Sequence, residues 1–206
     1  MRKVFLSTSL IGEIDPKNPT KYISDDFELS SNNYQFPLSY IIENDIEDGD
    51  NVVIITAVTQ TETPMQNYEV YKQEVLNIVK NKKIDIEFVE IKQAVEFDSL
   101  TFNQFFKEIA NLIQDNDQLY VDFSFGMKPY TISMFVAVAY AEKAARNVDV
   151  DTIIYAQKYS GSKVEGIISK VYDITGLFYL NAIAGNARPG QKHGLDKALG
   201  LIIDNN

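Results

Sequence analysis

One stretch of the sequence, residues 119–131, constrains the fold more than any other, because it predicts a strand, a turn and a helix in direct succession. Residues 119–123 are a short run of mostly β-prone apolar side chains, which is typical of a buried strand. Gly126 lets the backbone turn sharply, and Pro129 suits the first turn of a helix, where its missing N–H would have no partner. Residues 132–146 contain no helix breaker, so we expect a long, mostly buried helix there.

Polar or small residues recur at every second position through this turn, as Asp122, Ser124, Gly126 and Lys128. A polar turn between a buried strand and a buried helix places free N–H groups, a hydroxyl and a cation at the carboxyl edge of a sheet. Open α/β folds bind their ligands at that edge, and a helix N-terminus there favours an anion. The pattern alone leaves a second interpretation open, in which Asp122 and Ser124 cap the helix and Lys128 is solvated.

The alternation of strand and helix continues along the rest of the chain. Predicted strands cover residues 3–6, 51–57, 84–91, 148–156 and 167–174. Predicted helices cover residues 36–42, 65–81, 102–113, 177–184 and 195–203, and the polar residues 12–31 form a long loop. This order predicts an α/β fold, Rossmann-like, with a mostly parallel sheet and helices on both faces. Apolar and charged residues alternate within 84–91, so we expect that strand near an edge of the sheet.

Hydroxyl-rich loops follow the first two predicted strands. The first loop contains Ser7, Thr8 and Ser9, and the second contains Thr59 and Gln60. Right-handed crossovers bring the carboxyl ends of parallel strands to one edge, so both loops should converge on the polar turn described above. Hydroxyl groups in such loops can donate to a phosphate or a ribose. The alternative is that they bond only their own backbone, as Ser and Thr often do in turns.

Length and composition narrow the class of protein. With 206 residues, 45% of them apolar and 23% charged, the chain suits one globular domain with or without an appendage. It has no run of 18 apolar residues, no signal peptide pattern and no cysteine, so we expect a cytoplasmic protein without a membrane segment. A formal charge of −10 argues against broad binding to duplex nucleic acid. It leaves room for one small anion in a locally positive pocket.

Several common chemistries lack their motifs here. His193 is the single histidine, and no catalytic triad accompanies it. The sequence has neither a Walker A motif nor a glycine-rich dinucleotide fingerprint after the first strand. The acidic turn at residues 45–50 fits no known metal loop, so we expect no metal and no cofactor. The hydroxyl and lysine groups that remain suit phosphodiester recognition.

The segment Asp122-Phe-Ser-Phe-Gly-Met-Lys-Pro129 resembles a motif of the CARF domain, the CRISPR-associated Rossmann fold that senses cyclic oligoadenylates. Ser124 stands where the family has Thr, and Lys128 stands where it has Arg or Lys. Phe125 replaces a His of some relatives, which removes any role of that His here. The serine and threonine loop after the first strand is similar to the family's other ligand loop. The resemblance covers residues 1–185, which leaves residues 186–206 as a helical appendage or the start of a missing effector domain.

The resemblance implies a ligand, an assembly and a set of contacts. The ligand would be a cyclic oligoadenylate of type III antiviral signalling, with cyclic tetra-adenylate as the expected ring. A homodimer would hold it across its two-fold axis, so that each protomer makes the same contacts. Lys128 would neutralise phosphates, Thr8 and Ser9 would bond phosphate or 2′-OH groups, and Gln60 would contact an adenine edge. The implied ligand-binding residues are Ser7, Thr8, Ser9, Thr59, Gln60, Ser124, Phe125, Gly126, Met127 and Lys128.

Two alternatives stay open from the sequence. In the first, the chain is a stand-alone ring nuclease that cleaves the ring without a metal, with Ser9 orienting the ribose 2′-OH and Lys128 stabilising charge on the phosphate. No convincing general base supports that mechanism. In the second, the chain is an α/β regulatory or interaction protein whose ligand is unrelated.

Overall fold

The computed structural model describes residues 1–15, 20–96, 98–158 and 168–188, together with 190, 196 and 200. The strands are β1 (Arg2–Thr8), β2 (Lys21–Ile23), β3 (Asn51–Thr59), β4 (Asp85–Gln93), β5 (Asp117–Asp122), β6 (Asp149–Lys158) and β7 (Ile168–Asp173). The helices are α1 (Leu38–Asp45), α2 (Glu62–Val79), α3 (Ser99–Leu112), α4 (Lys128–Ala144) and α5 (Thr175–Gly185).

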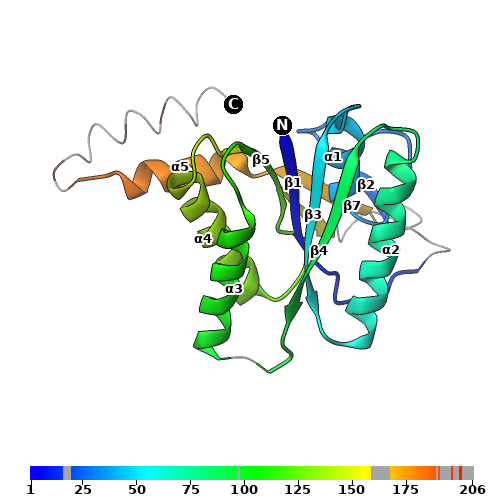
Figure 1. Ribbon diagram of the computed structural model, residues 1–206, viewed down its shortest axis with the longest axis horizontal. Helices are drawn as coiled ribbons and strands as arrows, with labels where there is room; N and C mark the ends of the chain where they lie inside the picture. Colours follow the sequence, from blue (N-terminus) through cyan, green and yellow to red (C-terminus); the bar gives the residue numbers. More distant parts are fainter. Residues whose placement is uncertain are drawn as a thin grey trace.

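The strands form one sheet in the order β2-β7-β6-β5-β1-β3-β4. All neighbours pair in parallel except β6 and β7, which are antiparallel. Figure 1 shows α1 and α2 on one side of the sheet and α3 and α4 on the other. Each side buries its own apolar cluster, so the predicted α/β, Rossmann-like arrangement is confirmed. The expected edge position of residues 84–91 is also confirmed, because β4 ends the sheet.

The direction in which the chain winds reverses between β1 and β5. After β1 the chain forms β2 at the far edge of the sheet, returns to the other side of β1 to form β3 and β4, and then crosses β1 again to form β5 and β6. The chain leaves β1 toward the face of α1 and α2 and leaves β5 toward the face of α3 and α4, so the carboxyl ends of these two strands form a topological switch point. Open α/β sheets bind ligands at such a switch point. The carboxyl ends of β1 and of the strands parallel to it lie at the bottom of Figure 1.

Two expectations about elements were wrong. The predicted loop over residues 12–31 contains the short strand β2, which pairs with β7 from far along the chain. Three residues held by a remote partner leave no local periodicity to detect. The helix expected after the polar turn spans Lys128–Ala144 with Pro129 in its first turn as predicted, but it is only half covered, because Ile132, Val136 and Tyr140 are exposed. The predicted helix over 195–203, like His193, lies almost wholly outside the described residues.

Candidate functional site

A row of polar side chains crosses the centre of the sheet at its carboxyl end. Ser7 of β1 lies directly between Asp122 of β5 and Thr56 of β3 in the strand register. Two residues earlier on each strand, the same face carries apolar side chains that pack beneath α1 and α2. The three polar residues are each at most 5% exposed, so this row takes buried positions that an apolar core would otherwise fill.

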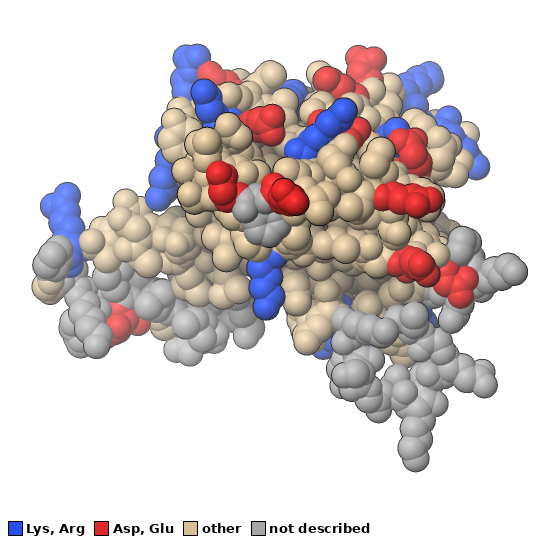
Figure 2. All heavy atoms as spheres, turned by 90° about the horizontal axis from the view of Figure 1, so that it is seen from below, with Lys and Arg blue, Asp and Glu red and all other residues tan. Residues whose placement is uncertain are grey.

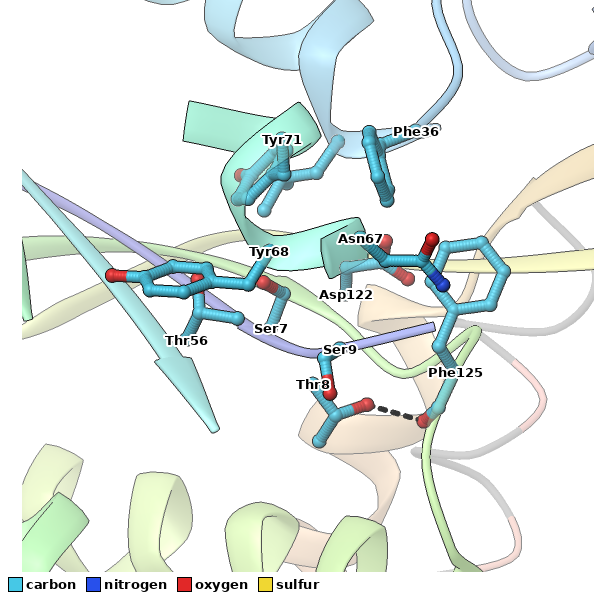
Figure 3. A pocket seen from close by; sticks show the side chains of 11 residues that line it. Ser7, Thr8, Ser9, Phe36, Thr56, Asn67, Tyr68, Tyr71, Asp122 and Phe125 are labelled. Carbon is cyan, nitrogen blue, oxygen red and sulfur yellow. Dashed lines mark hydrogen bonds between the residues drawn. The ribbon is translucent and has the colours of Figure 1, made fainter. Parts of the chain in front are cut away.

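Helix α2 closes a small pocket over this row (Figure 3). Tyr71, Asn67 and Tyr68 come from α2, while Phe36 and Phe125 complete the wall. The pocket has a volume of about 10 Å³, which is close to the space of a single water molecule. The hydroxyls of Thr56 and Tyr71 are buried there without a hydrogen-bond partner among the described residues.

Asp122 anchors the turn that follows β5 and does not cap helix α4. Its Oδ1 accepts a hydrogen bond from the Ser124 N–H at 2.7 Å. The Ser124 hydroxyl in turn accepts from the Ala156 N–H of β6 at 2.7 Å. Met127 occupies the cap position of α4 and makes no side-chain capping bond. The capping interpretation of Asp122 and Ser124 was therefore wrong, although both residues do hold the turn in place.

Gly126 is required by a close approach between the turn and β1. Its φ of +86° lies in the left-handed region, and a Cβ there would be 2.5 Å from Thr8 Oγ1. The Thr8 hydroxyl donates a hydrogen bond to the Phe125 carbonyl (Figure 3). The predicted sharp turn at Gly126 is confirmed, but the group that comes close to it is a threonine side chain of the same chain. Thr8 is thereby committed to holding the turn.

The hydroxyl loops after β1 and β3 do meet, and the second of them also bonds to β4. The Ser9 hydroxyl is buried and accepts from the Thr59 N–H at 3.3 Å. The Thr59 hydroxyl donates to Gln93 Oε1 at 3.0 Å. The Gln60 amide donates to the Val58 carbonyl at 2.9 Å and to Glu90 Oε1 at 3.1 Å. These hydroxyls bond to other segments and not only to their own backbone, so the backbone-bonding alternative does not describe them, and Gln60 leans toward β4.

The turn before α4 presents a run of free backbone donors. Phe125, Gly126, Met127 and Lys128 have N–H groups for which no acceptor is found among the described residues. Pro129 follows and has no N–H to place. The Lys128 side chain is exposed and forms no ion pair with any described residue. Successive free N–H groups beside a cation at a helix start form a favourable position for an anion.

A larger cleft lies beside the turn and was missed by the sequence interpretation. It has a volume of about 440 Å³ and shares Ser124 and Phe125 with the predicted site. Leu10 and Ile14 from the segment after β1 form part of its wall, and Ala156 of β6 lines it as well. That segment carries no recognisable motif, and only the pairing of β2 with β7 brings it over the sheet. Ser7, Thr8 and Ser9 line the small pocket, not this cleft.

Figure 2 views the molecule from the carboxyl ends of the parallel strands. Basic and acidic side chains are interspersed over the described part of this face, and the basic ones do not gather into one large patch. Within the described ranges, no cluster of residues could hold a metal ion, and no helix is long and apolar enough to cross a membrane. An anion bound at this edge would therefore be held by a few nearby groups, such as the N–H groups of the turn before α4 and the Lys128 side chain, and not by a broad basic surface.

Comparison of the sequence with protein-family models gives no match, and comparison with curated proteins gives none either. The geometry of the site is thus the main ground for a functional proposal, together with the motif at residues 122–129.

Asp122 should make the protein less stable as the pH rises from about 4 to 6. Burial raises the pKa of this carboxyl from 3.8 to about 6. Because the folded state binds the proton more tightly than the unfolded state, this stabilisation is present below pH 3.8 and is lost as the pH rises through 6. Near neutral pH the buried carboxylate costs roughly 3 kcal/mol relative to its protonated form.

The measurement is urea unfolding of wild type and Asp122→Asn at several pH values. Besides its hydrogen bond with Ser124, Asp122 interacts with two titratable groups, Tyr71 of α2 and Tyr22 of β2. Glu74 of α2 acts on the same tyrosines, and none of these groups is a cation. Asparagine keeps an oxygen for the Ser124 N–H but cannot ionise. The stability of the variant relative to wild type should rise with pH over the window from about 4 to 6. A difference that is the same at every pH would contradict the shifted pKa.

Proposed function

We propose that this chain is a CARF domain that binds a cyclic oligoadenylate, with cyclic tetra-adenylate as the expected ring, at the turn between β5 and α4. The observation that carries the proposal is the turn before α4, where four consecutive N–H groups lack described acceptors and Lys128 stands beside them. Such an arrangement suits a phosphate, and charge-assisted bonds from Lys128 would strengthen the contact. The motif that resembles the family occupies this same turn.

The structure supports a more limited set of contacts than the resemblance implies. Gly126, Met127 and Lys128 offer donors at the surface, and we assign the phosphates to them. Thr8 and Ser9 are buried and already make hydrogen bonds, so they act by holding the turn and the neighbouring loop. Gln60 points its amide at β4, and its use for an adenine edge would require it to leave Glu90.

A homodimer fits the exposed face of α4. Ile132, Val136 and Tyr140 recur at every fourth position and are 64%, 49% and 54% exposed. This apolar stripe begins one turn after Lys128, so a second copy packed against it would place both phosphate sites beside the dimer interface. A ring with an even number of identical nucleotides shares the two-fold axis of such a dimer. Antiviral signalling through a ring of this kind is part of the same proposal.

We expect Val136→Glu to convert the dimer into monomers. A carboxylate in the middle of the α4 stripe would be buried without a partner in the dimer, which costs several kcal/mol. It would stay solvated in the monomer, so the fold should persist. Sedimentation velocity of wild type and variant measures the change. Leu76→Glu is the matched control, because Leu76 is 39% exposed on α2, on the opposite side of the sheet. Equal sedimentation of Val136→Glu and wild type would contradict this interface.

Gel filtration of the protein with labelled cyclic tetra-adenylate tests binding and cleavage together. Under the proposal the label elutes with the protein, and the ring recovered from that peak is intact. Ring nuclease activity has less support, since the Ser9 hydroxyl is only 4% exposed and accepts from Thr59. Recovery of a linear product with a 2′,3′-cyclic phosphate, in the presence of EDTA, would instead favour cleavage. Label that elutes alone would favour an α/β protein with an unrelated ligand.

A further inference from the structure

Strand β4 ends the sheet and leaves one long edge without a partner among the described strands. It runs for nine residues beside β3, and the register between the two strands has no break. Figure 1 shows β4 at the front of the sheet, with α3 on one side of it and α2 on the other. A long unpaired edge is a template for a further strand, and soluble proteins usually shorten, twist or cover such edges.

The backbone groups on the outer edge of β4 are free to bond. The Asp85 N–H donates to the Asp50 carbonyl at 3.1 Å, and the Gln93 carbonyl accepts from the Gln60 N–H at 3.1 Å. The odd-numbered residues of β4 therefore direct their backbone groups toward β3, because successive residues of a strand point to opposite edges. The even-numbered residues direct their N–H and C=O groups outward, where no described residue bonds to them: Ile86, Phe88, Glu90 and Lys92.

A groove lies along each face of this edge. On the α3 side the groove has a volume of about 500 Å³, and Val89, Ile91 and Leu112 supply its apolar lining. On the α2 side the groove has a volume of about 210 Å³, with Tyr68 and Glu90 in its wall. Successive side chains of a strand point to opposite faces, so a strand added outside β4 would direct one set of side chains into each groove. Main-chain bonds along an edge and pockets for alternate side chains are the two components of strand addition.

The charges around the edge favour a basic segment over a second copy of the chain. Three of the four charged side chains of β4 are acidic, namely Asp85, Glu87 and Glu90. Glu108 adds a carboxylate to the wall of the α3 groove. Pairing of β4 with β4 of a second copy would bring two acidic edges together, and like charges on paired strands are destabilising. Lysine or arginine side chains on an added strand would instead meet opposite charge.

We propose that the free edge of β4 binds an extended segment of a partner protein in which basic and apolar residues alternate. The segment adds one strand to the sheet outside β4. Its apolar side chains enter the α3 groove beside Val89 and Leu112, and its basic side chains reach the α2 groove beside Glu90. The proposal does not depend on ring binding, because two strands separate β4 from β5 and the turn that follows it.

The probe for the test is a fluorescent peptide of alternating lysine and valine, as long as β4 and capped at both ends. Fluorescence anisotropy measures its binding to the whole chain. Wild type should bind it at least about tenfold more tightly than a second peptide that has proline in place of every valine. The second peptide carries the same charge, but proline lacks the N–H and the strand geometry that pairing requires.

Lys92→Pro and Lys92→Ala form a matched pair on the protein side. Lys92→Pro removes one outward N–H and leaves the bonds to β3 in place, and proline is tolerated on edge strands. This variant should bind the lysine–valine peptide at least about tenfold more weakly than wild type. Its lost positive charge acts in the opposite direction, since it makes the edge more acidic. Lys92→Ala loses the same charge and keeps the N–H, so it should bind at least as tightly as wild type.

Each outcome decides for or against strand addition. If wild type binds both peptides equally, the attraction is one of charge alone and the proposal is wrong. It is also wrong if Lys92→Pro, shown to be folded by circular dichroism, binds the peptide as tightly as Lys92→Ala. Sedimentation velocity without peptide examines the other occupant: a wild-type dimer that Lys92→Pro separates into monomers would mean that a second copy covers the edge. Should Lys92→Pro misfold, the two peptides on wild type decide the question.

Discussion

Gly126→Ala is expected to destabilise the protein by about 2–5 kcal/mol and to abolish ring binding. The backbone at Gly126 has a φ of +86°, which costs a residue with a side chain about 1–2 kcal/mol. The added Cβ would also lie 2.5 Å from Thr8 Oγ1 and 2.8 Å from Thr8 Cβ. Thr8 is buried and donates a hydrogen bond to the Phe125 carbonyl. Its side chain therefore cannot move away from the added Cβ without breaking the bond that holds the turn.

Gly49→Ala is the matched control for this variant. Gly49 also has a left-handed φ, of +92°, but nothing lies within 4 Å of its Cβ position. It should therefore show the backbone cost alone, about 1–2 kcal/mol, and keep ring binding. Urea unfolding and ring titration of the two variants make the comparison. Equal stability of the two variants would mean that Thr8 does not constrain the turn.

Lys128→Ala is expected to weaken ring binding by about 3–6 kcal/mol in the dimer, because each protomer loses a charge-assisted phosphate contact worth about 1.5–3 kcal/mol. That loss corresponds to roughly a hundredfold to ten-thousandfold in affinity. The fold should persist, because Lys128 is exposed and makes no described contact that stabilises the chain. Added salt should weaken wild-type binding for the same electrostatic reason.

Lys143→Ala provides the control at the other end of the same helix. Lys143 is exposed in the last turn of α4, far along the helix from the proposed phosphate site. Its removal changes the net charge equally and should leave the affinity almost unchanged. Titration of both variants at one ionic strength gives the answer. If the two variants lose the same affinity, the effect comes from overall charge and the assignment of Lys128 is wrong.

The order of strands and helices could be predicted because each long element carries its own periodicity. The buried strands β3 and β5 are apolar runs, and α3 shows a strong apolar stripe. The short strand β2 could not be predicted, since only its pairing with β7 makes it a strand. The exposed stripe on α4 was also missed, because an apolar helix has the same composition whether a core or a partner covers it.

The place of the turn before α4 in the fold was predictable, but the side-chain contacts around it only in part. Gly126 and the polar turn follow from residue type, and the switch point follows from the topology. The hydrogen bonds made by the side chains of Thr8, Ser9 and Gln60 depend on distances between loops, and the sequence does not determine those distances. The row formed by Asp122 and Ser7 depends on strand register, and the cleft depends on the path of the segment after β1.

Isothermal titration calorimetry with cyclic tetra-adenylate and cyclic hexa-adenylate tests the central claim most directly. The proposal predicts heat of binding with cyclic tetra-adenylate at one ring for every two chains, since one ring lies on the two-fold axis of the dimer. The heat should be lost in Lys128→Ala and kept in Lys143→Ala. No heat with either ring, from folded wild-type protein at neutral pH, would contradict the claim that this chain binds a cyclic oligoadenylate.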